Sequence, residues 1–572
     1  MRGLVQNPPA DFTAVNQAAF ASLSVQQAAF TAGTLETTQT TATEPITERL
    51  GLKGTGTVTI KSALHLVQAG GRWLVRWSPA TIAPQLGPGD QLSLQKTWPA
   101  RAAILGTGGA ALTTQGQVVT IGVEGLRVKD ASVVQAALVS VGATAGQASS
   151  AIAAAKAHPT YFEPVFTVSR ARYDQIQATI YPIPGTVFQT GTARSAITPG
   201  LAAGLVGDVG PISAQELGQL GAPYDAQSVV GQTGLEQADE KQLAGQPGAT
   251  VTVVSKTGAT VATLATLPPH PGTPVRTTID PSVQMAAEAA LAPVKRSAAL
   301  VAVNATTGAV LAAVSVNSGG FDQALDGGFP PGSTFKVITS GALITHGLTP
   351  RSAASCPGSV TVDGEVFHNA EGEAPVTTML QAFTESCNTA FIRLATGHLT
   401  PPDLPAAASM FGLDSRLHIG LIAFGGSVPQ PSDKADLAAT AIGQGRVLVS
   451  PLALAMVAAA ADTGTVHSPS LVVGESGAGA VTGTLPSALV GDLHEMMASV
   501  VSSGTAAGQG LPAGTYAKTG TAQYGTAKPL KTDAWLVGFK GDIAFAALVI
   551  DSGGNGGPTC GPIVARFLSG LP

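Results

Sequence analysis

The sequence PGSTFK at residues 331–336 places a serine three residues before a lysine at the expected start of a helix. Residues three apart share one face of a helix, so the Ser333 hydroxyl and the Lys336 amine are expected within hydrogen-bonding reach. A neutral amine can take the proton of a serine hydroxyl, which activates the hydroxyl for covalent catalysis without a histidine. The stretch therefore predicts a nucleophile at the start of a core helix.

The residues around this pair predict where that helix begins and ends. FPPG at 329–332 predicts a rigid turn, and the residues from Phe335 to Ile344 are apolar on almost every side, as in a core helix. GLTP at 347–350 is a typical stop signal. A serine in the first turn also lies near the positive end of the helix dipole, which favours developing negative charge.

SxxK alone is a weak signal in a chain of 572 residues, and an ordinary helix start explains it equally well. Two later motifs change that balance. SCN at 386–388 follows the serine and lysine, and KTGT at 518–521 follows SCN. SxxK, SxN and KTG in this order are the signature of penicillin-binding proteins and related β-lactamases.

The chain resembles a class B penicillin-binding protein, a transpeptidase that cross-links peptidoglycan, over residues 276–572. Further segments resemble the family in the expected order: TTID at 277–280 with Gln284, ATTG at 305–308, IGQG at 442–445, GTA at 504–506 and DAWLVGF at 533–539. The resemblance implies a multidomain α+β fold. Its C-terminal penicillin-binding, serine β-lactamase-like transpeptidase domain is expected to have an antiparallel sheet flanked by helices.

A separate N-terminal domain is expected over residues 1–97. Helical stretches near 11–23 precede alternating patterns such as GTVTI at 56–60 and WLVRW at 73–77, which predict a helix on a curved antiparallel sheet. The tryptophan strand resembles the nuclear-transport-factor-like N-terminal domain of methicillin-resistance-type penicillin-binding proteins. An unrelated α+β domain is the alternative.

Residues 98–275 resemble the family's β-rich pedestal, a dimerisation-type domain. ARAAIL at 100–105 is a worn form of its arginine-glycine start, with Ala102 in place of the glycine, whereas VGQTGLE at 230–236 matches a pedestal element well. The resemblance implies a non-catalytic arm that meets partner proteins. For Glu236 a structural ion pair is the preferred interpretation.

Each residue of the first two motifs has an expected role. Ser333 attacks the carbonyl of the penultimate D-Ala of a stem peptide and forms an acyl-enzyme, with Lys336 as the base. Ser386 relays a proton to the leaving nitrogen, and Asn388 holds the substrate backbone. Spaced two residues apart in an extended loop, these side chains are expected to point to one side. Capping of a helix that begins near Thr389 is the structural alternative for Asn388.

The third motif is expected on a strand that edges the cleft. Lys518 helps to keep the amine of the first motif neutral and attracts the substrate carboxylate. Thr519 and Thr521 bind that carboxylate, and Gly520 lets a substrate strand approach the backbone closely. The backbone amides of Ser333 and Thr521 are expected to form the oxyanion hole.

Other motifs in the chain are weaker. SKTG at 255–258 precedes the nucleophile and lies between two strand patterns, which predicts a hairpin turn. SVN at 315–317 also precedes the nucleophile. HEMMA at 494–498 lacks the second histidine of a zinc protease, and no GxSxG elbow of an α/β-hydrolase occurs.

The same motifs leave alternative functions open. Water in place of an acceptor amine makes the chain a D,D-carboxypeptidase. A β-lactamase needs a general base for water, and Glu371, Glu373 and Glu385 match no such motif. A non-catalytic β-lactam-binding scaffold is expected to lose at least one of Ser333, Lys336 and Lys518, and all are present. A β-lactam sensor is expected to be coupled to a transmembrane signalling part.

Composition excludes several other classes. Charged residues make up 11% of the chain, the net charge is -5 and no basic cluster is present, so nucleic-acid binding has no support. The nine histidines are scattered, so no metal site is expected. No cofactor is expected either. Of the three cysteines, Cys387 is interpreted as a small buried residue, and a Cys356–Cys560 disulfide in an exported protein stays open.

Location and partners are expected from the resemblance. No run of about 18 apolar residues occurs, while class B enzymes work at the extracytoplasmic face of the bacterial cell membrane, so the expectation is a chain whose anchor is missing. The expected partners are stem peptides ending in D-Ala-D-Ala, β-lactam antibiotics such as penicillin, and cell-wall synthesis proteins such as a separate glycosyltransferase. Septal or elongation duty, β-lactam resistance and oligomeric state stay open.

Overall fold

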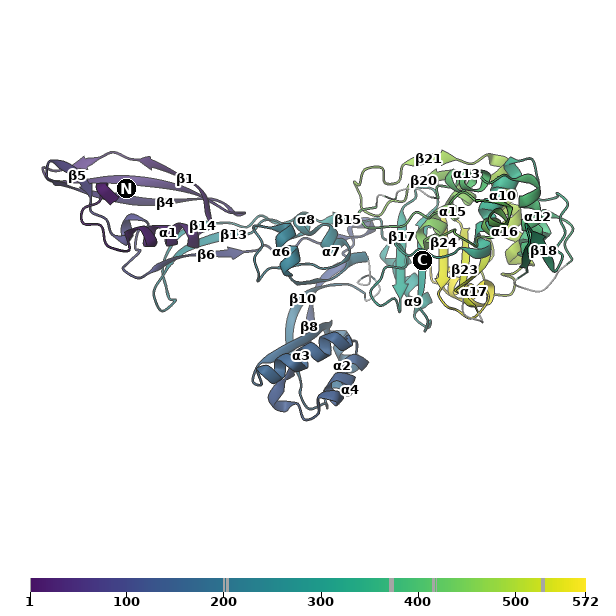
Figure 1. The fold of residues 1–572 in the computed structure, drawn as a ribbon, viewed down its shortest axis with the longest axis horizontal. Coiled ribbons are helices and arrows are strands. Elements are labelled where there is room, and N and C mark those ends of the chain that lie inside the picture. Colours follow the sequence, from purple (N-terminus) through teal and green to yellow (C-terminus); the bar gives the residue numbers. More distant parts are fainter. Residues whose placement is uncertain are drawn as a thin grey trace. The chain divides into compact units, whose positions relative to one another are not determined.

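The computed structural model describes residues 2–198, 201, 205–369, 375–413, 417, 419–525 and 530–572. The chain divides into two compact units, each assembled from separate stretches. The N-terminal unit comprises Met1–Ala103, Gly210–Val230 and Asp239–Val275, and the C-terminal unit comprises Ile104–Val209, Gly231–Ala238 and Arg276–Pro572. Figure 1 labels the helices and strands.

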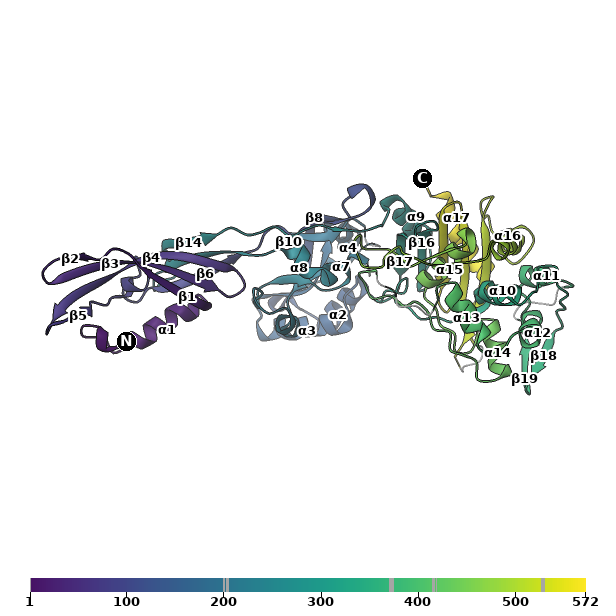
Figure 2. The ribbon, with the colours of Figure 1, turned by 90° about the horizontal axis from the view of Figure 1, so that it is seen from above.

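In the N-terminal unit a helix packs on antiparallel strands, as predicted for this part of the chain. Helix α1 (Phe12–Ser22) precedes a five-stranded sheet of β1 (Val25–Ala32), β2 (Glu36–Thr37), β3 (Thr41–Leu52), β4 (Gly56–Ala69) and β5 (Arg72–Val75). Figure 2 shows α1 along one face of these strands. Leu23 and the inward residues Leu50, Val58 and Ile60 form the core between them.

A second sheet completes the N-terminal unit. It has the order β14–β13–β6 and contains β6 (Gln91–Thr97), β13 (Gly248–Val254) and β14 (Thr260–Leu267). Val251 and Val253 point into the same core as the first sheet, because alternate strand residues face one side. The SKTG segment forms the turn between β13 and β14, so its interpretation as a hairpin turn is confirmed. Helices α6 (Ala214–Leu220) and α8 (Glu240–Ala244) also belong to this unit.

The C-terminal unit contains a small sheet with its own core. Its strands β8 (Thr113–Glu124), β9 (Phe162–Ser169) and β10 (Thr186–Ala196) have the order β10–β8–β9, and α2 (Ala131–Ser140), α3 (Ala145–Ala157) and α4 (Arg170–Ile180) cover them. Arg194 of β10 forms a buried ion pair with Glu236 of α7 (Gly234–Ala238). The structural interpretation of Glu236 is therefore confirmed.

A five-stranded antiparallel sheet forms the centre of the remaining part of this unit. It has the order β17–β16–β24–β23–β22 and contains β16 (Ala298–Asn304), β17 (Val310–Val316), β22 (Tyr516–Tyr524), β23 (Lys531–Lys540) and β24 (Ile543–Val549). Helices α9 (Pro281–Leu291) and α17 (Gly556–Ser569) cover one face, and α15 (Pro451–Thr463) covers the other (Figure 2). The sheet flanked by helices agrees with the prediction.

Further elements complete this part of the C-terminal unit, and some of them pack on the edge strand β22. They are η6 (Gly332–Phe335), α10 (Lys336–Thr345), α11 (Met379–Thr384), α12 (Asn388–His398), α13 (Asp403–Met410), α14 (Lys434–Ala441), α16 (Ser487–Ser502), and the hairpins β18 (Ser359–Val362) with β19 (Glu365–His368) and β20 (Thr465–His467) with β21 (Val481–Thr484). The 3-10 turn η6 packs directly against β22. None of the helices in the described ranges has the length and hydropathy needed to cross a membrane.

Candidate active site

Ser333 lies on a short 3-10 turn that leads into the buried helix α10, as predicted. Gly332 before it has a left-handed φ of 52°, and a Cβ there would lie 2.8 Å from the carbonyl oxygen of Thr521. Glycine alone fits both constraints. The indole N–H of Trp535 donates to the carbonyl oxygen of Pro330 over 3.0 Å. The turn that carries the serine is therefore held against β22 and β23.

The amine of Lys336 contacts polar groups of Ser333, Ser386 and Asn388, which the sequence predicted to share one site with it. Its Nζ lies 2.9 Å from Ser333 Oγ and 2.8 Å from Asn388 Oδ1. The carbonyl oxygen of Ser386 is 2.6 Å from the same nitrogen, and the hydroxyl of Ser386 is 3.4 Å from it. Because Lys336 is 0% exposed, these contacts take the place of water around the amine.

SCN does not form the extended loop that the sequence predicted. Ser386 has a left-handed φ of 59°, and Asn388 is the first residue of α12, whose N-terminal cap is Cys387. The capping role considered for Asn388 is therefore wrong. Ser386 ends the turn after α11 and Asn388 begins α12, and this bend, rather than a period-two strand, brings both side chains to Lys336.

Lys518 reaches the same serine from strand β22. Its Nζ donates to Ser386 Oγ over 2.8 Å and to the carbonyl oxygen of Thr519 over 3.0 Å, and its side chain is 0% exposed. The hydroxyl of Ser386 thus has a buried lysine on each side. Protonation of both lysines at once is disfavoured, because two cations would share a site with little water.

Two phenylalanine rings lie close to the amines of Lys336 and Lys518, and the sequence analysis did not predict them. The Lys336 Nζ lies 5.5 Å from the centre of the Phe391 ring, and the Lys518 Nζ lies 5.4 Å from the centre of the Phe383 ring. Both rings are fully buried. Phe391 follows Asn388 by three residues on α12, so helical spacing is the signal that could have identified it.

The two threonine hydroxyls of the KTGT segment on β22 differ in burial and in their hydrogen-bond partners. Thr519 is buried, and its Oγ1 lies 2.5 Å from the Oγ1 of Thr505, which belongs to the GTA segment. Thr521 is half-buried, and its Oγ1 accepts a hydrogen bond from the backbone N–H of Gly556 over 3.1 Å. Of the two threonines, Thr521 is the more open to a ligand.

Gly520 also allows a close packing contact that the sequence did not predict. A Cβ at this position would lie 2.7 Å from Thr334 Cγ2 and 2.8 Å from the carbonyl oxygen of Pro331. These atoms belong to the turn that carries the nucleophile, so the glycine allows β22 to pack against that turn. The approach of a substrate strand remains a prediction.

The cysteines correct another expectation. Cys356 forms a disulfide with Cys387, and Cys560 is a buried free thiol whose pKa is raised by burial. Cys387 is therefore a cross-linked residue between two site residues rather than only a small buried one. The two cysteines meet because the chain beside Cys356 packs on the start of α12, where Thr389 Oγ1 donates to the carbonyl oxygen of Pro357 over 2.7 Å.

The weaker motifs have structural partners elsewhere. Ser315 Oγ donates to Asp322, and Asn317 Nδ2 donates to two backbone carbonyl oxygens. The ring of His494 contacts the carbonyl oxygen of Asp462. Over the described ranges, no group of three or more His, Cys, Asp or Glu is arranged to hold a metal ion.

The three glutamates considered as bases for water divide into two groups. Glu385 is exposed at the end of α11. Glu371 and Glu373 lie outside the described residues.

Two family models match the chain, one after the other. The model described as "Penicillin-binding Protein dimerisation domain" matches residues 96–277, and the model described as "Penicillin binding protein transpeptidase domain" matches residues 298–569. The chain belongs to the class B penicillin-binding proteins. In this class B protein the second match includes all the motif residues from Ser333 to Thr521.

Named relatives cover part of the class B chain. It is 34% identical over 269 residues to "Peptidoglycan D,D-transpeptidase PbpA" of Mycolicibacterium smegmatis, and the matched stretch covers 43% of this chain and 54% of the relative. It is 38% identical over 162 residues to the protein of the same name from Mycobacterium tuberculosis, and this stretch covers 27% of this chain and 32% of the relative. The chain therefore spans about half or less of these relatives' lengths.

Solved structures share the fold of this class B protein. A penicillin-binding protein (PBP2) in complex with MreC, from Helicobacter pylori, matches with a TM-score of 0.62 and 20% identity over 84% of this chain and 99% of that chain. A chain from a peptidoglycan synthase complex matches with a TM-score of 0.62 and 24% identity over 84% and 92%. The multidomain α+β fold with a dimerisation domain and a transpeptidase domain agrees with the prediction.

Proposed function

We propose that this chain is a serine-type D-Ala-D-Ala transpeptidase that cross-links peptidoglycan stem peptides through an acyl-enzyme on Ser333. One observation carries the proposal: the nucleophile's Oγ lies 2.9 Å from the amine of Lys336, which is fully buried. A lysine can act as the general base only when it is neutral, and burial beside a second lysine favours the neutral amine. The relatives named as peptidoglycan D,D-transpeptidases support the same activity.

The acylation step uses both lysines and the serine between them. Ser333 Oγ forms a bond to the carbonyl carbon of the penultimate D-Ala while its proton passes to Lys336. The C–N bond to the terminal D-Ala then breaks, and the leaving nitrogen receives a proton through Ser386. The contacts of Ser386 Oγ with Lys336 at 3.4 Å and Lys518 at 2.8 Å support this relay.

Resolution of the acyl-enzyme completes the reaction. The amine of a neighbouring stem peptide attacks the ester, the Oγ–C bond breaks, and the new amide forms while the amine proton returns to Ser333 through the same groups. The backbone amides of Ser333 and Thr521 are proposed as the oxyanion hole, worth about 3 kcal/mol per donor. The carboxylate of the donor peptide is proposed to bind Lys518, Thr519 and Thr521, and its backbone to bind Asn388.

β-Lactams such as penicillin mimic the D-Ala-D-Ala end, so they are proposed to acylate Ser333. The test is intact-mass measurement after incubation with penicillin, for the wild type and for Ser333→Ala. A stable adduct in the wild type that the variant lacks supports the proposal, whereas the absence of any adduct contradicts it. Rapid release of penicilloic acid would identify a β-lactamase instead.

A second experiment separates the transpeptidase from a carboxypeptidase. A donor peptide ending in D-Ala-D-Ala is incubated with and without an amine acceptor, and the products are identified by mass. Formation of the cross-linked peptide supports transpeptidation; hydrolysis alone supports carboxypeptidation. Release of neither product, with penicillin still bound, would favour a non-catalytic β-lactam-binding scaffold or sensor.

The finer domain assignments are proposals too. Residues 1–97 are proposed as a nuclear-transport-factor-like domain, 98–275 as the pedestal and 276–572 as the transpeptidase domain. The helix on antiparallel strands in the first section supports the first assignment. We further propose action at the extracytoplasmic face of the membrane beside cell-wall synthesis proteins such as a separate glycosyltransferase. The neighbours described as a PBP2–MreC complex and a peptidoglycan synthase complex support partners of this kind.

A further inference from the structure

The IGQG segment at 442–445 has no part in the proposed reaction, yet it contacts the strand that carries KTGT. The half-buried side chain of Gln444 faces the backbone of Gln523 on β22. In the amide orientation that satisfies both partners, its Nε2 donates to the carbonyl oxygen of Gln523 over 3.0 Å, and its Oε1 accepts the N–H of the same residue over 3.2 Å. One side chain therefore makes the two hydrogen bonds that a residue of a neighbouring strand would make.

The backbone around Gln444 is fixed on both sides. The N–H of Gln444 donates to the carbonyl oxygen of Ala439 in α14 over 3.0 Å. The carbonyl oxygen of Gly443 accepts the N–H of Gly332 over 2.9 Å. Gly443 and Gly445 have left-handed φ values of 69° and 73°, which allow the chain to turn sharply before and after the glutamine. The amide is thus anchored by α14 and by the turn that carries the nucleophile.

The edge of β22 that binds this amide is the edge that faces the active site. Both backbone groups of Gln523 bind Gln444, so they point away from the paired strand β23. Backbone groups alternate in direction along a strand, so those of Thr519 and Thr521 point to the same side. The carbonyl oxygen of Thr519 accepts a hydrogen bond from Lys518 Nζ over 3.0 Å, which places this edge at the site.

A bound donor peptide meets these positions in a fixed order. Its carboxylate is proposed to bind Lys518 and Thr519, and the carbonyl of its penultimate D-Ala to accept the N–H of Thr521. The peptide then runs antiparallel to β22, with its earlier residues toward Gln523. Pairing positions recur every second residue, so the fourth residue from the carboxyl end of the donor would pair with Gln523. The amide of Gln444 occupies that position.

We propose that Gln444 limits how much of the donor peptide β22 can bind, by closing the edge of the strand after Thr521. This inference rests on the proposed transpeptidase function and adds a specificity-determining residue to it. The donor pairs with β22 at its penultimate D-Ala and leaves the strand before its fourth residue. A donor that displaced the amide would replace two hydrogen bonds by two of the same kind, with no net gain.

The test compares two capped peptides that differ by one methyl group. They are acetyl-Ala-Leu-D-Ala-D-Ala and its counterpart with N-methylalanine at the fourth position from the carboxyl end, which cannot donate to Gln523. Binding to the whole chain is measured as the peptide concentration that halves the rate of penicillin acylation of Ser333. With the wild type we expect the two peptides to compete equally, within about twofold.

Variants of Gln444 are expected to create a preference between the two peptides. Gln444→Ala frees the backbone of Gln523, so the unmethylated peptide should bind about fivefold more tightly than the methylated one, the usual effect of one hydrogen bond. Gln444→Ser opens the same position and gives an independent second variant. Gln430→Ala removes an exposed glutamine side chain from the same unit and is expected to keep the wild-type result. Penicillin acylation itself shows that each variant is folded.

Three results would overturn the inference. They are a clear preference of the wild type for the unmethylated peptide, equal competition by the two peptides in both Gln444 variants, and no competition by either peptide in any of the proteins. None of these results removes the penicillin adduct, which tests the proposed function separately. Absence of that adduct in the wild type would overturn the proposed function and this inference with it.

Discussion

The hydroxyl of Ser386 lies 2.8 Å from the Nζ of Lys518, although the two residues are 132 positions apart in the chain. Ser386 also lies 3.4 Å from Lys336, so it joins the two buried amines of the site. This connection links the second motif to the third and gives a proton a path from the base to the leaving group. It also makes the role of Ser386 testable by loss of a single hydroxyl.

Ser386→Ala is expected to slow acylation by penicillin by about 10²- to 10⁴-fold, the usual contribution of a proton-transferring group. The measurement is the second-order rate of adduct formation. Ser340→Ala is the matched control, because this hydroxyl lies on α10, is buried and has no hydrogen-bond partner within the described ranges. Equal rates for Ser386→Ala and the wild type would contradict the relay.

Lys336→Arg is expected to abolish the penicillin adduct, because it places a fixed positive charge where the reaction needs a neutral amine. A guanidinium stays protonated at all accessible pH values, so it cannot accept the proton of Ser333. Intact mass after incubation measures the adduct, and a melting curve shows whether the variant is folded. Lys540→Arg, at the end of β23, serves as the control. A folded Lys336→Arg protein that acylates at the wild-type rate would exclude Lys336 as the base.

Phe391→Leu is expected to shift the pH profile of acylation toward lower pH. The ring stabilises the charged form of the amine 5.5 Å from its centre by about 0.5–2 kcal/mol, so its removal favours the neutral form. The shift corresponds to about 0.4 to 1.5 pH units. Phe545→Leu, in the core strand β24, is expected to lower the melting temperature without moving the profile. An unmoved profile in Phe391→Leu, with a lowered melting temperature, would leave the ring a packing role alone.

Reduction of the Cys356–Cys387 disulfide is expected to destabilise the protein. The disulfide joins residues with a sequence separation of 31 and so lowers the conformational entropy of the unfolded chain. In the chain-entropy account this stabilises the folded state by about 3–4 kcal/mol. Reductant should therefore lower the melting temperature of the wild type and of Cys560→Ser, and leave Cys387→Ser unchanged. Alkylation of the denatured, unreduced protein should modify Cys560 alone. Three modified cysteines would show that the disulfide is absent.

Asp533 is expected to make the protein less stable as the pH rises. Burial raises its pKa to about 6, whereas in the unfolded chain an aspartate titrates near about 4. Below about pH 4 Asp533 is protonated in both the folded and the unfolded protein. Between about pH 4 and about pH 6 it is protonated in the folded protein and ionised in the unfolded chain. The free energy of unfolding therefore falls by about 3 kcal/mol from pH 4 to pH 6 and is then constant.

Asp533→Asn should remove that fall, because the amide does not ionise. Denaturant unfolding at pH 4 and pH 7 measures the difference for the variant and the wild type. Asp542→Asn, an exposed change on the turn after β23, should keep the wild-type slope. A wild-type slope in Asp533→Asn would place the titrating group elsewhere.

Local spacing explains what could be predicted around the nucleophile. Ser333 and Lys336 are three residues apart at a helix start, so their contact depends on helical geometry that the sequence already encodes. The order of the three motifs identified the family, and the alternation of strand residues predicted the helix-on-sheet arrangement of the first section. The sequence also predicts a structural ion pair for Glu236, and the structure identifies Arg194 as its partner.

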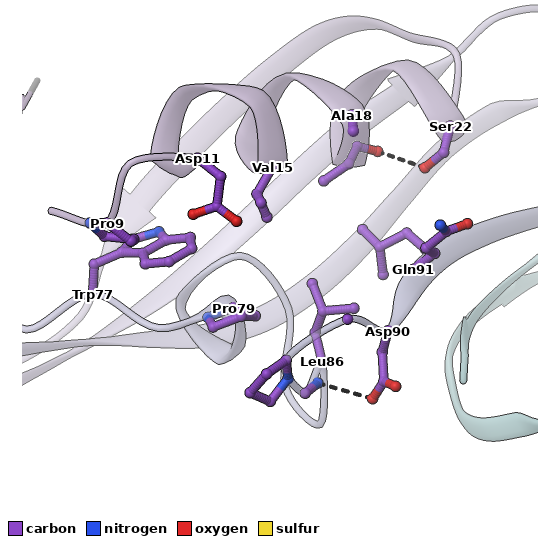
Figure 3. Close-up of a pocket in the computed structure, with 15 residues that line it drawn as sticks. Pro9, Asp11, Val15, Ala18, Ser22, Trp77, Pro79, Leu86, Asp90 and Gln91 are labelled. Carbon is purple, nitrogen blue, oxygen red and sulfur yellow. Dashed lines mark hydrogen bonds between the residues drawn. The ribbon is translucent and has the colours of Figure 1, made fainter. Parts of the chain in front are cut away.

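The tertiary structure decided the features that depend on distant segments. Three features each require two segments that are distant in the chain to meet, and no periodicity of the sequence reveals that they do. They are the pairing of Cys356 with Cys387, the packing of Gly520 against Thr334, and the cavity beside Trp77 that helix α1 also lines in the N-terminal unit (Figure 3). The left-handed turn at Ser386 is another case, because the convergence of α11 and α12 overrides the extended conformation that local spacing suggests. The sequence by itself thus determined which residues can do the chemistry, through short-range geometry. Long-range packing determined how they are held, because only a closed core fixes contacts between residues far apart in the chain.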